Sequence, residues 1–161
     1  ALARPVILGL TGLNLVYGLA LVSLLLSSFL MEGWTWRALG FDLTTAHPSI
    51  GHGLRAIVVI GIAGAVVVHA LLQRLLGIVA TVSSGDPFIV DNAQRLEAIA
   101  WCVLVLELLR MLVAAIAALA WESGRIDAFS FAPWLVVLLL FVLAGVFSHG
   151  ARMRADLEGT V

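Results

Sequence analysis

The sequence predicts an all-α polytopic membrane protein in which four transmembrane helices form a bundle. Of the 161 residues, 62% are hydrophobic and 12% are charged, whereas a soluble domain has roughly half and a quarter respectively. The apolar residues gather in four long stretches, and a crossing needs about 20 mostly apolar residues. Because a crossing segment must satisfy its own backbone hydrogen bonds, we expect each stretch to be a helix.

The four helices follow one another along a single domain that covers residues 1–161. We expect them at residues 5–31, 54–82, 92–121 and 130–151, followed by a polar tail at 152–161. The first and fourth helices contain no Asp, Glu, Lys or Arg, so an apolar environment suits their whole length. The longest connection, residues 32–53, could contain a short helix that lies on the outer membrane surface.

Arginine placement predicts the orientation of the chain. All basic residues other than histidine are arginines, and arginines are enriched in short cytoplasmic segments. If both termini are cytoplasmic, five arginines lie inside and three lie outside, which is a modest bias in the expected direction. The inside set is Arg4, Arg74, Arg95, Arg152 and Arg154, and the outside set is Arg37, Arg55 and Arg125.

Two charged residues, Glu107 and Arg110, lie near the centre of the third apolar stretch. Their spacing of three residues places them on one helix face. A charge at a helix centre costs about 3 kcal/mol on insertion, so we expect the pair to point into the bundle. Two interpretations remain open: an internal ion pair that stabilises packing, or a site for a proton, an ion or a ligand.

His69 and Asn14 are the other polar candidates inside the spans. His69 shares a stripe with Gly61 and Ala65, and small residues on a stripe predict a close helix contact. We therefore expect His69 to face inward, either as a packing residue or as a group that titrates near neutral pH. Asn14 aligns with Gly18 on the first helix and is expected to hydrogen-bond to a neighbouring helix.

The remaining composition argues against several function classes. We find no GxSxG, HExxH or P-loop motif, and the single cysteine, Cys102, excludes an intrachain disulfide. Two loop histidines, His47 and His52, make a weak metal site without nearby cysteines or carboxylates. The net charge of −1 shows no nucleic-acid footprint. We expect a protein that is not an enzyme and has no cofactor.

The segment before the third helix predicts a turn followed by a helix start. Gly85, Asp86 and Pro87 favour the turn, and Asp91 is then expected to cap the helix, with Gln94 reaching back as in a capping box. At the other end of the chain, the tail is expected to begin as a continuation of the fourth helix. Its arginines would lie near anionic lipid.

These two segments, GDPFIVDNAQRLEAIAW and FSHGARMRADLEGTV, resemble domain-of-unknown-function family 2975, a family of small bacterial inner-membrane proteins. The shared features are a Gly-x-Pro-Phe turn, an Asn-x-x-Arg-Leu helix start and a closing tail. The matching positions are Gly85, Pro87, Phe88, Asn92, Arg95, Leu96, Gly150, Arg154, Asp156, Glu158, Thr160 and Val161. The resemblance implies four spans and a regulatory setting, because members are often encoded beside a small helix-turn-helix regulator. It implies no enzymatic activity.

We therefore predict a regulatory or sensory component of the bacterial inner membrane, with a partner-facing surface built from the cytoplasmic turn and tail. The partner would be the helix-turn-helix regulator or another membrane protein, and the chain itself would not bind nucleic acid. The expected contacts are Asp86, Pro87, Phe88, Asn92, Arg95, Arg154, Asp156 and Glu158. Two alternatives remain: a small proton- or ion-coupled transporter acting as an oligomer, and a structural subunit of a membrane complex.

Overall fold

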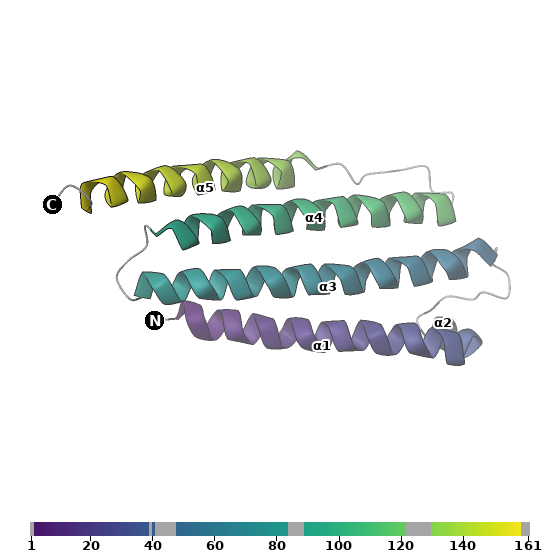
Figure 1. Cartoon of the computed structure of the whole chain (residues 1–161). Helices are drawn as coiled ribbons and strands as arrows, with labels where there is room; N and C mark the ends of the chain where they lie inside the picture. The colour runs from purple at the N-terminus through teal and green to yellow at the C-terminus, as the bar shows by residue number, and fades with distance from the viewer. Residues whose placement is uncertain (1, 39, 41–47, 84–88, 122–129, 159–161) are drawn as a thin grey trace.

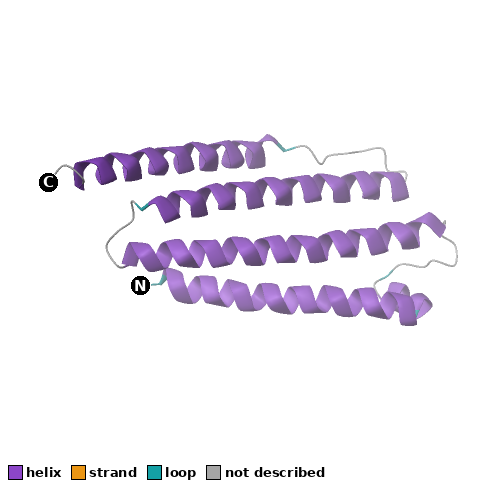
Figure 2. Ribbon diagram, in the orientation of Figure 1, coloured by secondary structure: helices purple, strands orange, loops and turns teal. Residues whose placement is uncertain are grey.

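The computed structural model describes residues 2–38, 40, 48–83, 89–121 and 130–158, and this part of the chain contains helices and no strand (Figure 2). Four long helices and one short helix follow in the order α1 (Ala3–Leu30), α2 (Glu32–Ala38), α3 (Pro48–Ser83), α4 (Val90–Trp121) and α5 (Phe131–Glu158). The four long helices are each apolar and long enough to cross a membrane. The predicted all-α architecture with four spanning helices is confirmed.

The helix ends differ from the sequence expectation at two places. Helix α3 begins at Pro48, six residues before the expected start at 54, because proline is well suited to the first turn of a helix, where no backbone N–H is needed. Helix α5 continues to Glu158 through most of the expected polar tail. The backbone of this segment is therefore a regular continuation of the fourth spanning helix.

The four long helices pack as an open row (Figure 1). Helix α1 contacts α3, α3 contacts α4, and α4 contacts α5, while no contact joins α1 to α5 in the described chain. The predicted bundle is thus not closed into a ring. Both termini lie at the same end of the row, as an even number of crossings requires, and the cytoplasmic assignment of that end stays a prediction.

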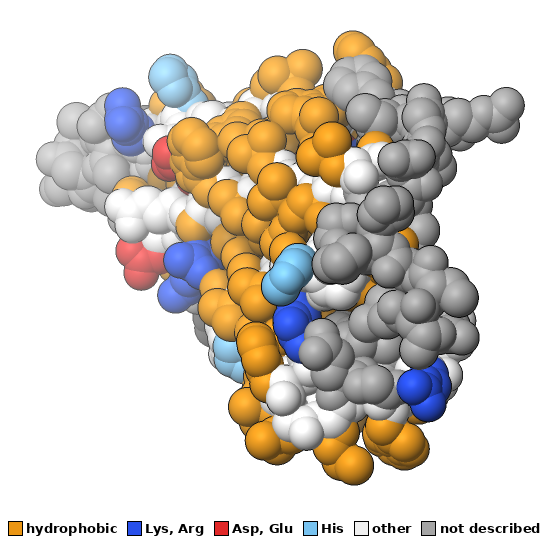
Figure 3. All heavy atoms as spheres, turned by 90° about the vertical axis from the view of Figure 1, so that its right-hand side faces the viewer, with side chains coloured by type: hydrophobic (Ala, Val, Ile, Leu, Met, Phe, Trp, Pro, Cys, Tyr) orange, Lys and Arg blue, Asp and Glu red, His pale blue; other side chains and the backbone are white. Residues whose placement is uncertain are grey.

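The open row leaves apolar side chains on the outside. Leu13 on α1 and Leu139 on α5 are each 66% exposed, and many leucines and valines of these two helices share this exposure. Figure 3, which looks onto the end that carries α2, shows hydrophobic side chains over much of the described surface. Such large exposed apolar area is incompatible with water and suits lipid.

Small residues set the contact between α1 and α3. A Cβ atom on Gly18 would lie 3.7 Å from the Cβ of Ala65, and one on Gly61 would lie 3.0 Å from Leu21 Cδ1. The backbones therefore approach closely, as is common between membrane helices. Across this contact, Asn14 Nδ2 donates a hydrogen bond to the Ala65 carbonyl oxygen at 2.9 Å.

Arg55 joins the start of α3 to the end of α1. Its Nη2 donates to the Ser28 carbonyl oxygen at 2.8 Å, and its guanidinium lies 4.6 Å from the centre of the Phe29 ring. Beside it, the buried Thr35 of α2 lies with its hydroxyl 3.0 Å from the Ser27 carbonyl oxygen. The Arg55 bond satisfies the Ser28 carbonyl oxygen in the last turn of α1, and the Thr35 hydroxyl adds to the bond that the Ser27 carbonyl oxygen accepts from the Met31 N–H at 2.8 Å.

Candidate functional site

Glu107 and Arg110 form an ion pair within α4. Arg110 Nε donates to Glu107 Oε2 at 2.9 Å, and Arg110 Nη2 donates to Oε1 at 2.6 Å. Both carboxylate oxygens are therefore held by the same guanidinium, which is the strongest geometry for this pair of groups. Glu107 is 5% exposed, whereas the Arg110 side chain is 43% exposed. The Glu107 carboxylate is therefore buried, whereas the Arg110 side chain is partly exposed.

Arg110 and His69 open onto different grooves. Arg110 borders a groove of about 270 Å³ between α1, α3 and α4, whose lining includes Tyr17 and Gly64. His69 borders a second groove of about 310 Å³ between α1 and α3. Gly64 and His69 are five residues apart, which is about 140° around a helix. The grooves therefore lie on opposite sides of the α1–α3 contact, marked by Ala65, which lines both.

This arrangement corrects one expectation from the sequence. A shared interior holding His69 together with the Glu107–Arg110 pair is wrong for the single chain, because the row of helices is open and α1 and α4 lie on different sides of α3. His69 Nδ1 is buried and, within the described structure, has no hydrogen-bond partner. Of the four intramembrane candidates, only Glu107 and Arg110 bond to each other.

A polar network joins α3 to α4 at the end of the row that carries the termini. The Asn92 Oδ1 atom accepts a hydrogen bond from Arg95 Nη1 at 3.0 Å and lies 2.9 Å from Thr81 Oγ1. Arg95 Nη1 also lies 3.1 Å from the Gly77 carbonyl oxygen. A Cβ atom on Gly77 would lie 3.1 Å from Arg95 Nε, so glycine leaves room for the guanidinium to lie against α3.

The start of α4 corrects two further expectations, one for Asn92 and one for Asp91. Asn92 is 0% exposed, so it is not a contact on a partner surface; burial is possible because Thr81 and Arg95 satisfy its amide oxygen. Arg95 is half-buried in the same network. Helix α4 begins at Val90, with the Ile89 carbonyl oxygen accepting its first bonds. Asp91 thus lies inside the first turn, where it suits the helix dipole, and does not cap the helix.

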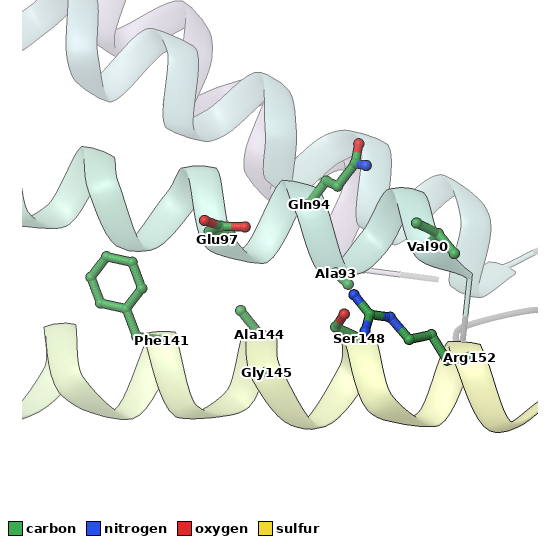
Figure 4. Close-up of a pocket in the computed structure, with 9 residues that line it drawn as sticks. All are labelled: Val90, Ala93, Gln94, Glu97, Phe141, Ala144, Gly145, Ser148 and Arg152. Carbon is green, nitrogen blue, oxygen red and sulfur yellow. The ribbon is translucent and has the colours of Figure 1, made fainter.

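A groove with mixed charge lies on the other side of α4, between its first turns and the last turns of α5 (Figure 4). We call it the α4/α5 groove; its volume is about 420 Å³. Figure 4 shows the Arg152 side chain reaching back from α5 over Ser148, with Phe141 near the membrane-side end. The lining residues are Val90, Ala93, Gln94, Glu97, Phe141, Ala144, Gly145, Ser148 and Arg152.

The α4/α5 groove places four polar side chains on its walls, namely Gln94, Glu97, Ser148 and Arg152. Glu97 and Arg152 are exposed, and between the described residues no ion pair links them. Both charges thus remain available to a bound molecule. Helices α4 and α5 lie close together beneath these polar side chains because Ala93 and Ala144 are small. Both alanines are buried, at 5% and 6% exposure.

These four residues were absent from the partner surface expected from the sequence. A signal existed, because spacings of three and four residues put Gln94 with Glu97, and Ser148 with Arg152, on single helix faces. What the sequence could not show is that α4 and α5 turn these faces toward each other. Among the expected contacts, Asp86, Pro87 and Phe88 lie outside the described residues, and so do the side chains of Arg154, Asp156 and Glu158.

The described residues contain no group of three His, Cys, Asp or Glu side chains that could hold a metal ion. Comparison with known proteins finds no significantly similar curated protein and no significantly similar solved structure. A family described as "Protein of unknown function (DUF2975)" matches residues 38–161. This match covers more than half of the chain. It includes α3, α4, α5 and the two segments that carry the family resemblance. The chain belongs to the DUF2975 family.

Proposed function

We propose that this protein is a regulatory or sensory component of the bacterial inner membrane, and that the α4/α5 groove is where a cytoplasmic protein partner docks. One observation carries the proposal: a carboxylate and a guanidinium, Glu97 and Arg152, line one groove without pairing to each other. The groove lies between the start of α4 and the last turns of α5, and these helix ends are at the end of the row that carries both termini. Charged groups suited to polar recognition are therefore exposed at this end.

The depth of the two charges favours a polypeptide over a phospholipid. The rings of Trp101 and Phe141 meet edge to face at 5.3 Å, which sets the antiparallel alignment of α4 with α5. Glu97 then lies about 10 Å nearer the membrane centre than Arg152, at 1.5 Å per residue. A lipid phosphate at Arg152 would place its ester groups beside a carboxylate, which cannot donate a hydrogen bond to them. A protein segment can carry both an acid and a base.

The family resemblance supports the identity of this partner. Members are often encoded beside a small helix-turn-helix regulator, so a regulator held at the membrane by the α4/α5 groove would be withheld from, or released to, its DNA. In this role the chain needs no enzymatic activity and no direct contact with nucleic acid. A signal would reach the groove through the packing of α4 against α5.

The test measures binding of the purified regulator encoded beside the gene to the full chain in lipid nanodiscs. We expect Glu97→Gln and Arg152→Gln each to weaken binding about 5- to 10-fold, which corresponds to roughly 1–1.4 kcal/mol. The matched controls are Asp91→Asn and Arg74→Gln, because both residues lie outside the groove and Arg74 bonds to the Ala70 carbonyl oxygen of its own helix. If the regulator binds all four variants equally well, docking in the α4/α5 groove is refuted.

The transporter alternative depends on the Glu107–Arg110 pair. Both oxygens of the buried Glu107 carboxylate accept hydrogen bonds from Arg110, and the positive guanidinium beside them opposes binding of a further proton or cation. This geometry supports a packing role for the pair. The structural-subunit alternative would use the exposed apolar faces of α1 and α5, which suit either lipid or another membrane protein.

A further inference from the structure

A second cleft at the same end of the molecule has a different chemistry. It lies between the start of α1 and the last turns of α3 and has a volume of about 730 Å³. Arg4 and Gln73 supply charged and amide donors to it, and Leu76 and Val79 supply apolar walls. The described residues that line this cleft include no carboxylate, in contrast to the α4/α5 groove. We call it the α1/α3 cleft, and its charge suits an anion.

The apolar groove that His69 lines lies on the same side of the α1–α3 contact as the α1/α3 cleft, nearer the membrane centre. His69 and Gln73 are four residues apart and so lie on the same face of α3, one turn from each other. On α1, Arg4 and Leu15 share a face by the same periodicity, and Leu15 lines the apolar groove. The basic cleft and the apolar groove thus follow one another along a single side of the α1–α3 contact, and this order defines a path toward the membrane centre.

The depth order along this path matches the layout of a phospholipid. The contacts of Asn14 and Gly18 with Ala65 set the register of α1 on α3. Arg4 is then level with residues 75–79, and Gln73 lies about 6 Å nearer the membrane centre. In a glycerophospholipid the ester carbonyl groups likewise lie below the phosphate, and the acyl chains lie below the esters.

We propose that the α1/α3 cleft and the groove below it bind one anionic phospholipid. The Arg4 guanidinium binds the phosphate through charge-assisted hydrogen bonds, and the Gln73 amide donates to an ester carbonyl. One acyl chain follows the apolar groove past Ile62 and Val66. Basic pockets between membrane helices on the cytoplasmic side bind acidic lipid headgroups in this manner. This inference stands independently of the partner docking proposed above.

The experiment counts lipids retained by the purified full chain in native mass spectrometry after addition of phosphatidylglycerol or phosphatidylcholine with identical acyl chains. We expect one phosphatidylglycerol to be retained about fivefold more strongly than phosphatidylcholine, since one surface arginine contributes a preference of this size. Arg4→Gln should remove the preference, and Arg4→Lys should keep most of it. The matched control Arg74→Gln removes an arginine of α3 that lies outside the cleft and bonds to the Ala70 carbonyl oxygen of its own helix, and it should change nothing.

Two further variants separate lipid binding from simple anion binding. Val66 is 65% exposed, so Val66→Trp can fill the apolar groove without disturbing the core. It should weaken retention of both lipids several-fold, as should Gln73→Ala. The proposal is overturned if Arg4→Gln keeps the preference, or if Arg74→Gln loses it equally. It is also overturned if Val66→Trp has no effect and inorganic phosphate displaces the lipid, because the ligand is then a free anion.

Discussion

Replacing Glu107 with glutamine removes the negative half of the ion pair inside α4 while keeping the side-chain shape. The substitution leaves Arg110 as an uncompensated charge at membrane depth. Arg110 cannot move readily into water, because it lies in the middle of a helix of 32 residues and its side chain is half-exposed to a groove among apolar residues. We therefore expect a loss of folding stability.

The size of this loss follows from the contacts. Two charge-assisted hydrogen bonds, at 2.9 and 2.6 Å, are replaced by at most one bond to a neutral amide. Bonds to charged groups contribute about 1.5–3 kcal/mol each and neutral bonds about 1 kcal/mol, while an unpaired arginine at a helix centre costs about 3 kcal/mol. We expect Glu107→Gln to lower the free energy of unfolding by about 2–3 kcal/mol, and Arg110→Gln by a similar amount because it leaves the buried carboxylate unpaired.

The double variant Glu107→Gln/Arg110→Gln carries no charge at this position, so it should be less destabilised than either single variant, with a coupling energy of at least about 2–3 kcal/mol. The assay is reversible unfolding by dodecyl sulfate in mixed micelles, followed by circular dichroism. Arg74→Gln is the control, because Arg74 bonds to the Ala70 carbonyl oxygen of its own helix and should change stability by less than about 0.5 kcal/mol. Additive losses in the double variant would refute the reasoning.

Three further predictions concern transport and the polar network of Thr81, Asn92 and Arg95 between α3 and α4. Gly77→Ala should displace Arg95 and be about 1–2 kcal/mol less stable than the control Gly145→Ala, where an added Cβ meets nothing within 4 Å and helix propensity rises; unfolding in mixed micelles measures both. Asn92→Ala should lower the unfolding free energy by about 2 kcal/mol, since two donors lose their buried acceptor; an unchanged midpoint would contradict this. Proteoliposomes of the folded chain should show no proton flux, and flux that Glu107→Gln abolishes would instead establish the transporter alternative.

Sequence reasoning identified the ion pair but not what surrounds it. The spacing of Glu107 and Arg110 is a local property of one helix, so their pairing follows from helical geometry alone. Whether His69 joins them depends on the angle at which α1 and α4 pack on α3, which involves residues far apart in the chain. That angle places His69 and Arg110 on opposite sides of the α1–α3 contact.

The end of the molecule that carries the termini shows the same division. Asn92 and Arg95 belong to a short motif that the family resemblance led us to place on a partner-facing surface. The structure buries Asn92, because Thr81 and Arg95 satisfy its oxygen and Gly77 leaves room for the guanidinium. The sequence did not show this burial, because Thr81 and Gly77 come from the preceding helix.

The sequence by itself determined that this is a helical membrane protein with four spans, because the length and apolar composition of each stretch are sufficient for that inference. It also determined membership of the DUF2975 family. Only the tertiary structure decided that the helices form an open row and that its polar end carries two different clefts, one with mixed charge and one basic. The physical reason is that hydropathy acts on each helix separately, whereas clefts form where two helix faces meet.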